Sequence, residues 1–61
     1  MNDVDVEIEY TRKLFRSYYT VTISAVFRGA EITATASDPD LKAAQVEANR
    51  VFELGVKGVS R

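Results

Sequence analysis

Three consecutive segments of the chain alternate between apolar and polar residues, and this alternation restricts the fold more than any other sequence feature. Successive side chains of a β-strand point to opposite faces of a sheet, so each alternating segment is typical of a strand with one buried face. The pattern predicts strands over residues 3–11, 18–28 and 31–37. The residues expected on the buried face are Val4, Val6, Ile8, Tyr10, Tyr19, Val21, Ile23, Ala25, Phe27, Ile32, Ala34 and Ala36.

The two connections between the predicted strands differ in how well they specify a turn. Residues 12–17 contain no Gly, Pro or Asn and therefore define no tight turn. Within them, we expect Leu14 and Phe15 to close one end of the core. The second connection contains Gly29, and a two-residue turn at Gly29-Ala30 pairs apolar with apolar residues. A turn at Arg28-Gly29 leaves the same residues on each face of the sheet. The sequence therefore predicts which residues share a face more firmly than it predicts the pairing register.

The C-terminal third changes to a helical period. An apolar stripe at helical spacing predicts a helix over residues 39–54. We interpret Asp38 as the N-cap, Pro39 as the first helical residue, and Gly55 as the left-handed residue that ends the helix. Residues 56–61 are then expected to form a frayed tail. The stripe consists of Leu41, Ala44, Ala48, Val51 and Phe52.

Together these elements predict a single small α+β domain over residues 1–61. It is a three-stranded antiparallel β-meander with one C-terminal α-helix packed on one face, in the order β-β-β-α. A chain of 61 residues buries only roughly 60% of the surface that its unfolded form exposes. It contains no cysteine and no histidine, so a disulfide and an ordinary zinc site are both excluded. We therefore expect a homodimer to provide the missing burial.

Two surfaces are candidates for binding a partner. One is the basic-aromatic hairpin tip, which can contact phosphates and stack on a base, or can simply close the core. The other is the open sheet face, which is either an ordinary solvated face or a flat surface for a partner or a second copy. The sequence does not choose between them. The candidate residues are Arg12, Lys13, Phe15 and Arg16 at the tip, and Glu7, Glu9, Thr20 and Thr22 on the open face.

Catalytic chemistry is not expected. Glu7 and Glu9 are two residues apart on a strand, an arrangement that can serve acid–base chemistry or bind a divalent cation. A catalytic carboxylate needs a secluded pocket, however, and three strands with one helix leave little room for one. The serines have no histidine to activate them. We therefore predict no enzymatic activity, no cofactor and no metal site.

The function that we predict is a non-catalytic protein-binding module, a small inhibitor or adaptor that occludes a surface of its partner. A chain of this size is typical of phage and mobile-element products. The alternatives are a small nucleic-acid-binding module that uses the tip, and a structural subunit of an oligomeric assembly. The start of the chain, with Asp3, Asp5, Glu7 and Glu9, is unlike a signal peptide, and no apolar stretch reaches the length of a membrane span. We therefore expect a cytoplasmic location and no membrane association.

Overall fold

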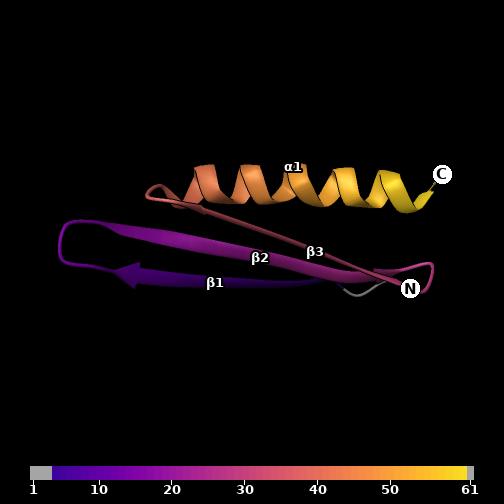
Figure 1. The fold of residues 1–61 in the computed structure, drawn as a ribbon, viewed down its shortest axis with the longest axis horizontal. Coiled ribbons are helices and arrows are strands. Elements are labelled where there is room, and N and C mark those ends of the chain that lie inside the picture. The colour runs from indigo at the N-terminus through magenta and orange to yellow at the C-terminus, as the bar shows by residue number, and fades with distance from the viewer. Residues whose placement is uncertain (1–3, 61) are drawn as a thin grey trace.

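The computed structural model describes residues 4–60 and has the element order β-β-β-α (Figure 1). Strands β1 (Val4–Arg12), β2 (Ser17–Phe27) and β3 (Ala30–Asp38) form an antiparallel sheet in the order β1-β2-β3, and the helix α1 (Leu41–Ser60) follows. The predicted meander with one C-terminal helix is therefore confirmed. Each strand begins and ends within one residue of its predicted bounds, except that residue 3 lies outside the described residues.

The turn between β2 and β3 lies at Arg28-Gly29, so the register predicted from a Gly29-Ala30 turn is wrong by two residues. Phe27 pairs with Ala30, and the rest of the β2–β3 ladder follows from that pair. Arg28 has a φ of 53° and Gly29 a φ of 81°. Positive φ at both central residues is the requirement of a type I′ turn, whose twist matches that of a hairpin. The apolar faces are unchanged, because a shift of two residues preserves parity.

The core lies between α1 and the half of the sheet formed by β2 and β3. Ala44 and Ala48 of α1 are completely buried and pack in one cluster with Val21 and Ile23 of β2. Because alanine side chains are small, the helix axis can lie close to the strands. Further buried residues of the sheet are Ala25, Ile32 and Ala34, and partly buried Ala36, Leu41 and Phe52 pack around the cluster.

The helix begins at Leu41, two residues later than predicted. The Asp38 carboxylate accepts a hydrogen bond from the Asp40 backbone N–H at 2.9 Å. The Asp40 carbonyl in turn accepts the N–H of Ala44 at 3.0 Å. The residue whose carbonyl accepts the first intrahelical bond is the cap, so Asp40 holds this position. Asp38 instead forms an Asx-type turn ahead of the helix, with Pro39 inside that turn.

The prediction that Gly55 ends the helix is also wrong, because α1 continues to Ser60. Residues 56–60 are therefore helical rather than a frayed tail. A Cβ atom on Gly55 would lie 2.8 Å from Cγ2 of Ile32 on β3. Glycine is thus required at this position by close approach of the helix to the strand, not by a left-handed backbone.

We predict that Gly55→Ala lowers the free energy of unfolding by roughly 1 kcal/mol, measured by urea denaturation. Overpacking against Ile32 costs typically about 1–3 kcal/mol, and the better helix propensity of alanine offsets about 1 kcal/mol of it. Gly58→Ala is the matched control, because an added Cβ there meets no atom within 4 Å. That variant should be stabilised by up to about 1 kcal/mol. Equal stabilisation of both variants would show that the helix does not approach Ile32 closely.

A second pair of variants tests the β2–β3 turn. Arg28→Asn should raise the free energy of unfolding by about 0.5 kcal/mol, because Asn-Gly is the preferred type I′ sequence. Arg28→Val should lower it by about 1–2 kcal/mol, because a β-branched residue is strained at positive φ. Both variants lose the contact between the Arg28 guanidinium and the Phe27 ring, 5.6 Å from its centroid. The difference between them in thermal denaturation therefore reports the backbone conformation, and equal stabilities would rule out the type I′ turn.

Candidate functional site

The apolar row of β1 is not covered by the helix. Its four side chains, Val4, Val6, Ile8 and Tyr10, are between 49% and 55% exposed, and we call them the β1 strip. Helix α1 neighbours only β2 and β3, and β1 neighbours only β2 (Figure 1). The expectation that the helix covers the whole apolar layer is therefore wrong. A helix is about 10 Å wide and adjacent strands lie about 4.8 Å apart, so one helix covers two strands and leaves the third open.

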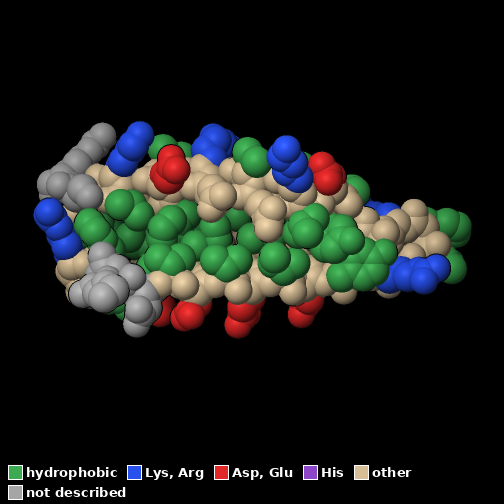
Figure 2. Space-filling model, turned by 180° about the vertical axis from the view of Figure 1, so that it is seen from behind, with side chains coloured by type: hydrophobic (Ala, Val, Ile, Leu, Met, Phe, Trp, Pro, Cys, Tyr) green, Lys and Arg blue, Asp and Glu red, His purple; other side chains and the backbone are tan. Residues whose placement is uncertain are grey.

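The β1 strip adjoins a hollow whose helix side is lined by uncharged side chains. Figure 2 shows a continuous band of hydrophobic side chains between the outer surface of the helix and a row of acidic side chains. Within this band, the uncharged Gln45 and Asn49 of α1 line a hollow of about 290 Å³ together with Val6, Val21 and Ile23. The band therefore has uncharged polar side chains beside it at this hollow and acidic side chains along its opposite edge.

The hairpin tip between β1 and β2 projects from the body of the protein. Pairing of β1 with β2 continues to Arg12–Ser17, whereas pairing of β2 with β3 stops at Tyr19–Asp38, so no third strand or helix lies beside the tip (Figure 1). Leu14 is 88% exposed and Phe15 is 93% exposed. These two residues do not close the core, contrary to the sequence-based expectation, because no part of the chain within residues 4–60 packs closely on them.

The tip is nevertheless a hydrogen-bonded and strongly basic loop. The Lys13 N–H donates to the Arg16 carbonyl at 2.7 Å and closes the loop. The Arg16 guanidinium lies 5.9 Å from the centroid of the Tyr18 ring, within the range of a cation–π contact. Arg12, Lys13 and Arg16 are all exposed. The tip therefore presents two apolar side chains among three cations.

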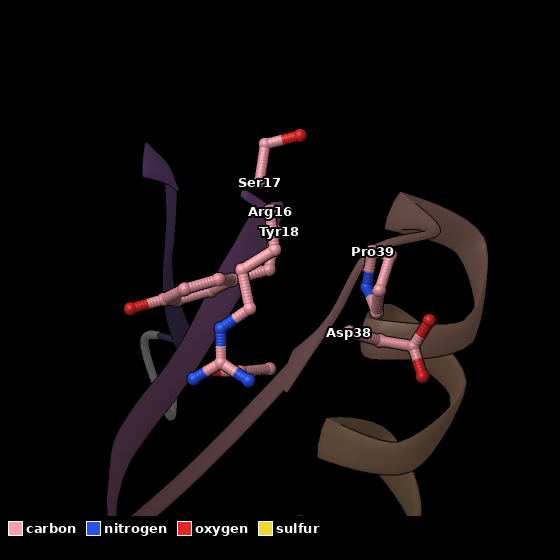
Figure 3. Close-up of a pocket in the computed structure, with 6 residues that line it drawn as sticks. Arg16, Ser17, Tyr18, Asp38 and Pro39 are labelled. Atoms are coloured by element: carbon pink, nitrogen blue, oxygen red, sulfur yellow. The ribbon is translucent and has the colours of Figure 1, made fainter. Parts of the chain in front are cut away.

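A shallow pocket of about 360 Å³ lies at the base of the tip (Figure 3). The Asp38 carboxylate points away from Arg16 in this view and accepts from the Asp40 N–H instead. The sequence did not point to this pocket, although the pairing of Tyr19 with Asp38 places the two chain segments side by side. The lining residues are Arg16, Ser17, Tyr18, Ser37, Asp38 and Pro39.

The predicted residues of the open sheet face form two cross-strand pairs. Glu7 lies opposite Thr22, and Glu9 lies opposite Thr20. The two threonine hydroxyls are engaged across the β2–β3 ladder: Thr20 with the Ser37 hydroxyl at 2.9 Å, and Thr22 as acceptor from Thr35 at 3.5 Å. The eight predicted contact residues therefore separate into the tip and the open face, which is the side of the sheet opposite α1.

Other polar features do not assemble into a chemical site. On the exposed surface of α1, the Arg50 guanidinium donates to the Glu47 carboxylate at 2.5 Å, which lowers the pKa of Glu47 and raises that of Arg50. Within residues 4–60, no group of three or more His, Cys, Asp or Glu side chains is placed to hold a metal ion. No helix in the same part of the chain combines the length and apolar composition needed to cross a membrane.

The β1 strip is the surface that sequence reasoning missed. The alternation identified its four residues but assigned them to the core, and only the width of one helix relative to three strands signals that they stay exposed.

The chain matches no protein-family model, and the searches of curated proteins and of solved structures likewise find no similar protein.

Proposed function

We propose that this chain is a non-catalytic protein-binding module, an inhibitor or adaptor that places its hairpin tip, residues 12–16, on a partner protein and occludes that surface. The observation that carries the proposal is the exposure of Leu14 and Phe15, at 88% and 93%, at the end of a hairpin that the Lys13–Arg16 backbone hydrogen bond closes. Fully burying one such side chain is worth about 1.5–3 kcal/mol. Because both side chains stay exposed in the fold, folding gains little of this free energy. The free energy of burying them is therefore available for binding another molecule.

The charges around the tip indicate the chemistry of the partner. Arg12, Lys13 and Arg16 surround the apolar pair, whereas the acidic Glu7 and Glu9 lie farther along β1. The tip is therefore a local basic patch on a chain whose net charge is only −1. An acidic partner surface with an apolar pocket fits this arrangement, because complementary charges steer association and a buried aromatic anchor supplies affinity.

A nucleic-acid partner is the second candidate, favoured by the exposed Phe15 ring beside three cations. Such a ring can stack on a base while the cations contact phosphates. The equally exposed Leu14 favours the protein partner, because an aliphatic side chain gives no stacking surface. The two candidates use the same loop and differ in the effect of salt, since phosphate contacts weaken steeply as the salt concentration rises.

We predict that the double variant Leu14→Ser/Phe15→Ser loses the partner, with affinity reduced by about 100-fold or more, because two central apolar anchors are removed. Affinity capture from the native host with the wild-type chain and the variant as parallel baits would identify the partner, and titration would measure the loss. Both residues are highly exposed, so the far-ultraviolet circular dichroism spectrum should not change. Val46→Ser, at a residue that is 60% exposed on α1, is the matched control and should bind normally.

Two outcomes would contradict the protein-binding proposal. One is capture of the same proteins by the wild-type chain and the tip variant. The other is retardation of single-stranded oligonucleotides in a low-salt gel shift, abolished in Arg12→Ala/Arg16→Ala, with no protein captured. The second outcome would assign the tip to nucleic acid.

A further inference from the structure

The chain exposes more surface than a compact monomer of the same mass. It exposes 4770 Å² of accessible surface, whereas a compact monomer of 6.8 kDa exposes about 4,000 Å². Its radius of gyration is 12.9 Å, against about 10.5 Å for a compact domain of this length. The chain is elongated, with principal extents of 43 × 16 × 14 Å, and its exposed apolar surface includes both the hairpin tip and the β1 strip.

The β1 strip is a continuous apolar part of this exposed surface. Its side chains are about half exposed although they belong to the same face as the core. The strip adjoins the hollow lined by Gln45 and Asn49, so its helix-side neighbours at this hollow are uncharged. A patch of this kind is self-complementary, because two copies related by a two-fold axis bring apolar atoms together without opposing like charges.

Charge decides how a second copy can approach β1. Among residues 4–60, no strand pairs with the outer edge of β1, so two copies could in principle extend the sheet edge to edge. Antiparallel pairing of two β1 strands would place Asp5, Glu7 and Glu9 beside the same acidic row of the other copy. Like charges on neighbouring strands are destabilising, and charged side chains are a common protection of edge strands. Packing of the opposite, apolar faces avoids this repulsion.

We propose that a second copy of this chain covers the β1 strip face to face, so that each strip packs on the strip and the adjoining α1 flank of the other copy. The acidic rows then face solvent, and the two hairpin tips remain exposed. This inference does not depend on the function proposed for the tip, because the strip and the tip are separate surfaces.

Sedimentation equilibrium of the full chain tests this arrangement. The wild-type protein should have twice the mass of one chain. Ile8→Lys should raise the dimer dissociation constant by at least about 100-fold, because each copy would bury an unpaired charge. Ile8 is 49% exposed in the single chain, so the monomer should tolerate lysine. Val6→Thr, which keeps the strand shape, is a milder variant that should weaken the dimer by about 10-fold through the buried hydroxyl.

Control variants separate this geometry from the alternatives. Val46→Lys and the tip variant Leu14→Ser/Phe15→Ser should dimerise as the wild type does, because neither changes the strip. Glu7→Thr should leave the affinity unchanged, whereas edge-to-edge pairing would be tightened by loss of the acidic repulsion. A wild-type chain that remains monomeric at about 100 μM, far above the micromolar limit of weak standard-size interfaces, would overturn the proposal. So would a folded Ile8→Lys variant with wild-type affinity, or tighter association of Glu7→Thr.

Discussion

The close packing of α1 on β2 and β3 is the interaction on which the rest of the structure depends. Residues with small or absent side chains form this contact: Ala44 and Ala48 against the β2 cluster, and Gly55 against Ile32 of β3. Because the helix lies so near two strands, its lateral reach ends at β2. The uncovered state of β1 is thus a direct geometric consequence of the packing that forms the core.

A narrow core also explains the separation of the surface into regions of different chemistry. Alternation places most large apolar residues of the sheet on one face, with Val26 and Tyr18 on the other, and the helix covers the first face only over β2 and β3. The remaining apolar row lies on the reverse of the acidic row formed by Asp5, Glu7 and Glu9, since neighbouring residues of β1 point to opposite faces. Apolar, acidic and basic surfaces therefore follow from one strand and the loop after it.

The sequence was sufficient for those parts of the fold that depend on local periodicity. The strand positions, their faces and the presence of the helix follow from spacing alone, as the buried Val21, Ile23 and Ala34 show. Features that depend on tertiary distance were not predictable in this way. Gly55 is a residue type that commonly ends helices, yet it lies inside α1. Its lack of a side chain accommodates the close approach of Ile32. The observed turn register differs from the one predicted for a Gly29-Ala30 turn, because both candidate turns place the same residues on each face. The positive φ of Arg28 identifies the turn as Arg28-Gly29.

The same distinction applies to the candidate site. Alternation shows which face of β1 is apolar but contains no information on what covers it, so Ile8 has the same sequence signal as the buried Ile23. Leu14 and Phe15 are residue types typical of a core. They lie beyond the body of the protein because the pairing of β1 with β2 extends farther toward this end than the pairing of β2 with β3. The face-to-face dimer that we propose would bury the strip and leave both tips free. Such a dimer would carry two equivalent tips on one rigid body, and a partner with repeated sites would then be bound with higher avidity than a single tip provides.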